Sequence, residues 1–123
     1  FFRIGPDFNF TLFEDWNLWG SYLYGEDDNG LFQTTGSGKI KSWGGFTGVT
    51  HKLNDDWILS LLHNYVDVDR KPALNVNVIT ANLSYYLMRN LKFMFEVSGD
   101  MQDTSVNHTE KTHTGVFGVV FAY

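Results

Sequence analysis

The feature that most constrains this chain is a two-residue alternation of apolar and polar side chains. Between Leu91 and Asp100, one parity carries Phe93 and Phe95, while the other carries charged and polar residues such as Lys92. Successive side chains of a β-strand point to opposite faces, so this period predicts strands that separate two different environments. The same alternation recurs in residues 1–13, 77–88 and 113–123.

We expect an all-β chain of about seven strands. Glycines at Gly44, Gly45 and Gly48 weaken the pattern of one strand and indicate a bend or a close approach of backbones. The connections alternate between short turns and longer polar loops, which predicts an up-and-down antiparallel sheet with unequal ends. The expected strands are roughly 1–13, 17–27, 39–53, 56–69, 75–88, 90–102 and 113–123.

Composition excludes several classes of protein. Hydrophobic residues make up 43% of the chain, which is too many for a disordered one, and no apolar run approaches the ~18 residues of a membrane-spanning helix. A net charge of −5 without basic clusters argues against a nucleic-acid partner. The absence of Cys excludes disulfides, thiolate catalysis, Cys-ligated zinc and haem attached through a CxxCH motif. The chain opens on Phe1 and not on Met, as expected of a processed or truncated N-terminus.

Strand length and aromatic placement favour a membrane environment for the apolar parity. Most expected strands are longer than the ~5–6 residues typical of soluble proteins and match the ~9–11 that cross a bilayer. Aromatic residues gather at both ends of the sheet, as in the girdles of membrane barrels, although aromatics are also common in strands generally. Phe13, Trp16, Trp57, Tyr86 and Tyr123 fall at the short-turn end, and Phe1, Tyr24 and Tyr65 fall toward the long-loop end. The expected membrane-interface aromatics are Trp16, Trp57, Tyr65 and Tyr123.

The end of the chain resembles a known signal. The run Gly118-Val119-Val120-Phe121-Ala122-Tyr123 is similar to the C-terminal assembly signal of Gram-negative outer-membrane barrels, with Phe117, Val119, Phe121 and Tyr123 on alternate positions. Residues 16–29 resemble a strand and loop of porin-like proteins. The resemblance implies an outer-membrane barrel with a periplasmic C-terminus. Its partners would be outer-membrane lipid, lipopolysaccharide and, through the last strand, the barrel-assembly machinery.

An odd number of strands does not close a bacterial barrel, and open edges in lipid are costly. Residues 1–123 are therefore expected to form a single β-barrel segment, the C-terminal part of a larger barrel wall. The alternative is one miscounted strand in a complete eight-stranded barrel.

The polar parity supplies the candidate pore-lining residues, since mixed charges set ion preference in channels. They could equally pair with one another across strands. No catalytic motif, cofactor site or metal site is expected, and His63 and Ser60 have opposite parity, so they form no pair. The candidate pore-lining residues are Arg3, Asp7, Asn9, Lys92, Glu96 and Asp100.

Three functional hypotheses follow. The first is a porin-like channel, not an enzyme, for passive diffusion of small hydrophilic solutes or ions, either alone or as a homo-oligomer. The second is a barrel sheath around a multihaem cytochrome in an outer-membrane electron conduit. The third is a soluble lipid-binding barrel whose interior is lined by Phe2, Phe10, Phe93 and Phe95.

Overall fold

The computed structural model describes residues 2–27, 39–69, 74–101 and 112–121, and these form eight strands without an α-helix. The expected strand boundaries agree with the observed ones to within about two residues, except in the first strand. The strands are β1 (Phe2–Ile4), β2 (Asp7–Phe13), β3 (Trp16–Asp27), β4 (Ile40–Lys52), β5 (Trp57–Val68), β6 (Val76–Met88), β7 (Leu91–Asp100) and β8 (His113–Phe121).

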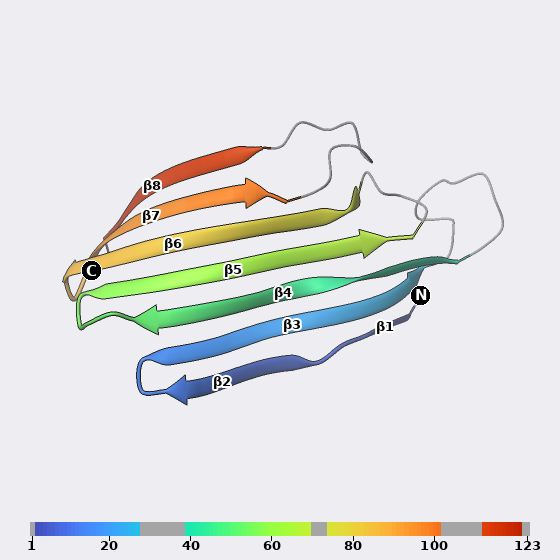
Figure 1. Cartoon of the computed structure of the whole chain (residues 1–123), viewed down its shortest axis with the longest axis horizontal. Coiled ribbons are helices and arrows are strands. Elements are labelled where there is room, and N and C mark those ends of the chain that lie inside the picture. Colours follow the sequence, from blue (N-terminus) through green and yellow to red (C-terminus); the bar gives the residue numbers. More distant parts are fainter. Residues whose placement is uncertain (1, 28–38, 70–73, 102–111, 122–123) are drawn as a thin grey trace.

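All strands belong to one antiparallel sheet in which neighbours in sequence are neighbours in space (Figure 1). The sheet order is β1-β3-β4-β5-β6-β7-β8, and β2 also pairs with β3. Because β1 and β2 share one position beside β3, the eight strands occupy seven positions. The expected up-and-down antiparallel topology is confirmed.

The first expected strand, residues 1–13, is interrupted at Gly5 and Pro6. Proline has no backbone N–H for the ladder, and a side chain at Gly5 would overlap the carbonyl oxygen of Tyr22. The chain stays close to β3 here, since Tyr22 N donates to Pro6 O (3.1 Å). The pairs Ile4 with Tyr24 and Asp7 with Ser21 keep the same register on both sides of the break.

Short turns join β2 to β3, β4 to β5 and β6 to β7 at one end of the sheet (Figure 1). The residues at which β3, β5 and β7 end lie at the other end, which we call the long-loop end. In the β4–β5 turn, Asn54 Oδ1 accepts hydrogen bonds from the backbone N–H groups of Asp56 and Trp57, each at 3.0 Å. These hydrogen bonds form an Asx turn, which ends at Trp57, the first residue of β5. Register shifts between Thr11 and Phe13 and between Tyr86 and Met88 lie beside the other two short turns.

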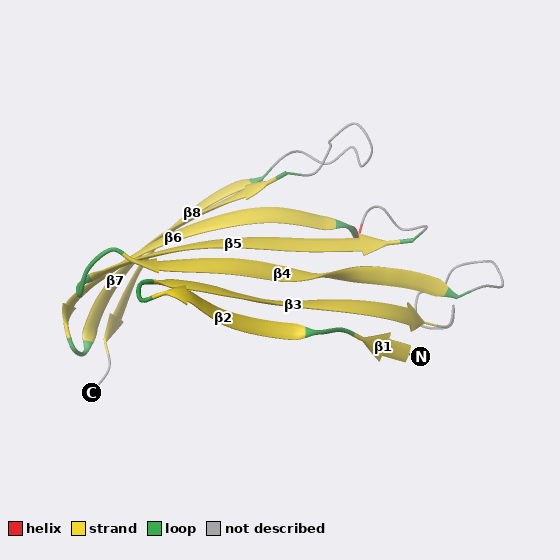
Figure 2. Cartoon of the chain, turned by 60° about the horizontal axis from the view of Figure 1, so that its bottom comes forward, coloured by secondary structure: helices red, strands yellow, loops and turns green. Residues whose placement is uncertain are grey.

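The described strands form a single curved layer, and none of them covers either face (Figure 2). Within the described residues β2 pairs only with β3 and β8 only with β7, so the sheet is not closed. This result contradicts the alternative of a complete eight-stranded barrel. Ile40 and Val68 are the buried hydrophobic side chains of the described part, so the sheet has almost no core of its own.

Glycines in β4 permit the close approaches that the sequence indicated. The Trp19 indole of β3 lies over Gly48, where an added Cβ would come within 2.5 Å of Trp19 Cε2 and Cζ2. The indole Nε1 donates to Thr50 Oγ1 at 3.3 Å. The absence of a side chain at Gly48 therefore leaves the space in which the Trp19 indole packs against the backbone of β4.

Substitution of Gly48 should destabilise the sheet. Gly48→Ala should push the Trp19 indole away from Thr50 and cost about 1–3 kcal/mol in the free energy of unfolding, the usual cost of overpacking. Gly115→Ala is the matched control, since a Cβ there would meet no atom within 4 Å. Urea unfolding in detergent, followed by Trp fluorescence, measures both. Equal free energies of unfolding for the two variants would contradict the packing of Trp19 over Gly48.

Candidate functional site

The constant register of the sheet divides its side chains between two faces. Directly paired residues of antiparallel strands point the same way, so each pair extends a face across the next strand. Apart from residues at the two register shifts, even-numbered residues of β1–β3 and odd-numbered residues of β4–β8 share one face. We call this the apolar face, and the opposite one the polar face.

The apolar face exposes large hydrophobic side chains across the sheet. Leu61 is 48% exposed, Phe95 61% and Phe117 60%. One row of directly paired residues contains only apolar residues and glycine: Leu18, Val49, Leu61, Ala81, Val97 and Gly115. An exposed apolar surface that spans a whole sheet marks a face that contacts lipid or another protein.

Aromatic residues flank this surface at both ends. At the short-turn end Trp57 stacks on Tyr85 (ring centroids 4.6 Å apart), and Trp16 stacks on His51 (4.0 Å). At the long-loop end, the Trp43 ring contacts the ring of Tyr65 (4.8 Å). Tyr24 directly pairs with Trp43 at that end. The structure thus places the expected aromatics Trp16, Trp57 and Tyr65 on this face, while Tyr123 lies outside the described residues.

Several polar groups on the apolar face are hydrogen-bonded to each other. His63 Nε2 and Asn77 Oδ1 are 2.9 Å apart, and Tyr22 Oη and Thr47 Oγ1 are 2.8 Å apart. His63 therefore has an amide as its partner, and Ser60 lies on the opposite face. His63 and Ser60 therefore do not form a pair, as the parity of the two residues predicted.

The polar face carries a continuous row of hydrogen-bonding side chains. Trp19 Nε1 donates to Thr50 Oγ1, whose other neighbour is Ser60 Oγ at 3.2 Å. Asn82 accepts from Ser84 Oγ (2.9 Å) and donates to Glu96 Oε2 (3.5 Å). We call this row the polar ladder; its directly paired members, from β2 to β7, are Thr11, Asn17, Thr50, Ser60, Asn82 and Glu96.

Sequence reasoning missed most of the polar ladder. Its central members lie in strands whose alternation is weak, so parity alone did not single them out. The register of β3, β4 and β5 brings them together, and sequence gives no direct signal of register. Asn17 Oδ1 is enclosed there and accepts no hydrogen bond from the described residues.

All six candidate pore-lining residues lie on the polar face, but the structure does not bring them into one cluster. Three lie on β1 and β2, and three lie on β7, with four strands between the two groups. Lys92 Nζ lies 5.6 Å from the ring centroid of Tyr86. Tyr86, expected in the aromatic girdle, is thus on the polar face. The residues are Arg3, Asp7, Asn9, Lys92, Glu96 and Asp100.

One acidic residue of the polar face lies outside the candidate pore-lining set. Asp27 is 3% exposed, and its Oδ2 lies 3.5 Å from Arg3 Nη2. Asp27 is the last residue of β3. The pairing of β1 with β3 places Arg3 beside it.

The last strand presents its apolar side chains at the sheet edge. Phe117, Val119 and Phe121, three members of the expected assembly signal, share the apolar face of β8. Each is more than half exposed, at 60%, 55% and 60% respectively. Tyr123, the fourth member, lies outside the described residues.

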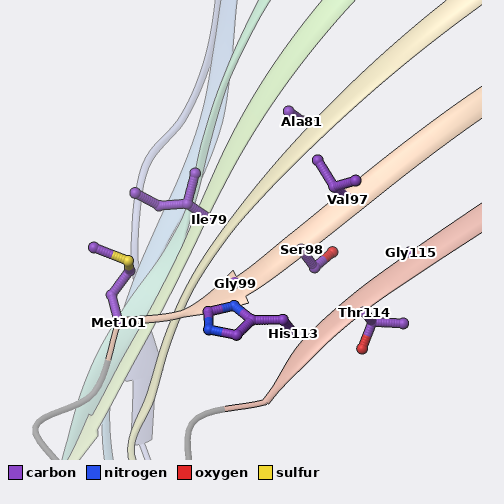
Figure 3. A pocket seen from close by; sticks show the side chains of 9 residues that line it. All are labelled: Ile79, Ala81, Val97, Ser98, Gly99, Met101, His113, Thr114 and Gly115. Carbon is purple, nitrogen blue, oxygen red and sulfur yellow. The ribbon is translucent and has the colours of Figure 1, made fainter.

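An open hollow of about 500 Å³ lies on the apolar side of β6, β7 and β8 (Figure 3). Ile79 and Val97 border it, and His113 is its one ionisable lining residue within the described ranges. The Ser98 hydroxyl shares a hydrogen bond with Thr80 (2.9 Å) on the polar face, so Ser98 and His113 do not form a nucleophile–base pair.

No trio of His, Cys, Asp or Glu among the described residues is arranged to hold a metal ion. A helix long and apolar enough to cross a membrane is likewise absent from the described part. The chain matches no family model, and comparison with curated proteins and with solved structures finds no similar protein.

Charge in the β4–β5 turn is locally paired. The Lys52 ammonium donates to Asp55 Oδ1 at 2.7 Å and holds the pKa of that carboxyl below its usual value. Lys52→Met should therefore raise the pKa of Asp55 toward the ordinary value, measured by NMR titration in detergent micelles. In the unsubstituted chain, the small stabilisation from this pair is present above the ordinary Asp pKa and is lost as pH falls through the lowered value. Lys92→Met is the control and should leave the pKa of Asp55 unchanged. The pairing would be contradicted if Lys52→Met also left the pKa of Asp55 unchanged.

Proposed function

We propose that this chain forms part of the wall of an outer-membrane β-barrel, a porin-like channel for passive diffusion of small hydrophilic solutes. The observation that carries the proposal is the sidedness of the sheet. One face exposes apolar side chains between two groups of aromatics, and the other carries the polar ladder. Lipid outside and water inside is the arrangement that satisfies both faces.

The dimensions of the strands support this proposal. Six of the strands, β3 to β8, have between 9 and 13 residues. The aromatics Trp57 and Tyr65 mark the two ends of the apolar face on β5. They are about 27 Å apart along the strand at ~3.4 Å per residue, or about 21 Å along the membrane normal at a tilt of ~40°. A membrane barrel has an apolar band of about 25 Å.

The open edges fit a wall that continues. In lipid, each unpaired backbone N–H or C=O costs several kcal/mol, so β2 and β8 require partner strands on their outer sides. The proposal therefore includes further strands that close the barrel.

The four Trp residues test the orientation. Trp16, Trp43 and Trp57 lie on the apolar face and Trp19 on the polar face. Single-Trp variants, with the other three changed to Phe, are reconstituted into vesicles that contain brominated lipid. The three outer residues should be quenched, and Trp19 should be protected. Quenching of Trp19 with protection of the others would place the polar face outward and overturn the proposal.

Pore activity is tested on the native protein, purified in detergent and inserted into a planar bilayer. A channel should give discrete, ohmic conductance steps. Extraction without detergent as a stable monomer would instead indicate the soluble lipid-binding barrel, whose apolar face would line an interior.

A second candidate function is the sheath around a multihaem cytochrome. The observation that favours it is an apolar patch on the polar face near the long-loop end, where Leu23, Val66, Val76 and Val78 lie. Such a patch suits a protein partner inside the barrel better than it suits water. Tightly co-purifying haem absorbance with no conductance would select this function over the channel.

A further inference from the structure

The polar face is electrically neutral across its central strands. On β3 to β6 its charged residues are Asp27 and Lys52, which lie at opposite ends of the sheet. The other charges of this face lie on β1, β2 and β7. On the polar face, β3 to β6 carry hydroxyl and carboxamide groups, which include those of Asn17, Thr50, Ser60 and Asn82.

We propose that the uncharged members of the polar ladder, from Thr11 to Asn82, make the channel selective for uncharged, polyhydroxylated solutes of the sugar or polyol class over ions of the same size. The inference rests on the proposed function, since it names the solute class of that pore. It differs from the sequence-based expectation, in which charged residues set an ion preference.

The chemistry of the ladder matches such solutes. A hydroxyl both donates and accepts hydrogen bonds, and a carboxamide has an NH₂ donor and a carbonyl acceptor. The wall can therefore replace water around a polyol hydroxyl either as a donor or as an acceptor. In the Thr50–Ser60 pair either hydroxyl can donate, so the bond can reverse when a solute hydroxyl arrives. An ion of either sign meets no opposite charge among Asn17, Thr50, Ser60 and Asn82, and it gains little there by leaving water.

An aromatic surface lies beside the ladder. The half-buried Trp19 indole is held flat over Gly48, and its ring lies 5.5 Å from that of Phe46 on the same face. The C–H faces of a sugar ring pack on such a surface, while the sugar hydroxyls meet Thr50 and its neighbours. The ladder and the indole together form an amphipathic contact that matches the apolar faces and the hydroxyl edges of a sugar ring.

The test compares three probes of similar size in vesicles that contain the native protein: glucose, gluconate and N-methylglucamine. The expected result is that glucose enters about fivefold faster than either ion, measured by vesicle swelling. Equal or slower entry of glucose in vesicles that conduct would overturn the inference and leave the channel intact. Failure of all three probes, without conductance, would overturn both proposals.

Two isosteric variants on one strand locate the effect. Thr50→Val removes a ladder hydroxyl and should lower the advantage of glucose by about threefold. Thr47→Val is the matched control, since Thr47 lies on β4 with its hydroxyl bonded to Tyr22 on the apolar face. It should leave all three permeation rates unchanged. Loss of the glucose advantage in both variants, or in neither, would overturn the assignment to the ladder.

Discussion

The backbone ladder, with its uninterrupted register, is the constraint on which the rest of this structure depends. Every strand from β3 to β8 pairs with its neighbour in antiparallel register, and irregularities occur only beside short turns among the described strands. Because side chains alternate, a slip of one residue would exchange the two faces of a strand. Both faces, and the row from Thr11 to Glu96, exist because no such slip occurs away from the short turns.

A second consequence concerns burial. A single layer cannot hide apolar side chains between two sheets, and Ile40 and Val68 are the buried hydrophobic residues of the described part. Globular domains derive most of their stability from such burial. In this sheet the apolar side chains of one face are exposed instead, so apolar contact has to come from outside the sheet. The proposed bilayer supplies this contact without a second layer of protein.

The sequence was sufficient for the parts of the fold that depend on local pattern. Strand positions, the short turns and the clean faces of β7 follow from a period of two and from turn residues. The break at Gly5 and Pro6 was not predicted, because apolar alternation continues through it from Ile4 to Phe8. Its cause is the proline, together with a close approach to β3.

The candidate site was predictable only where charge marked it. The six charged or amide residues of β1, β2 and β7 do share the polar face, as parity indicated. Thr50 and Ser60 carry no such mark, and they lie in strands where apolar residues occupy both parities. Only pairing between strands shows that they form one row, and pairing is a long-range property that local sequence does not encode.

The interruption at Gly5 and Pro6 has a consequence for how the sheet opens. Three ladder pairs join β1 to β3, beyond a proline that cannot extend the hydrogen bonds of β2. Short segments of this kind open locally with little free energy, while the rest of a sheet stays folded. The Arg3–Asp27 ion pair lies within this segment. The ion pair therefore helps to hold β1 on β3, at a strand end that could otherwise fray while the rest of the sheet stays folded. Release of β1 would expose the Asp27 carboxylate, which is nearly buried in the folded sheet.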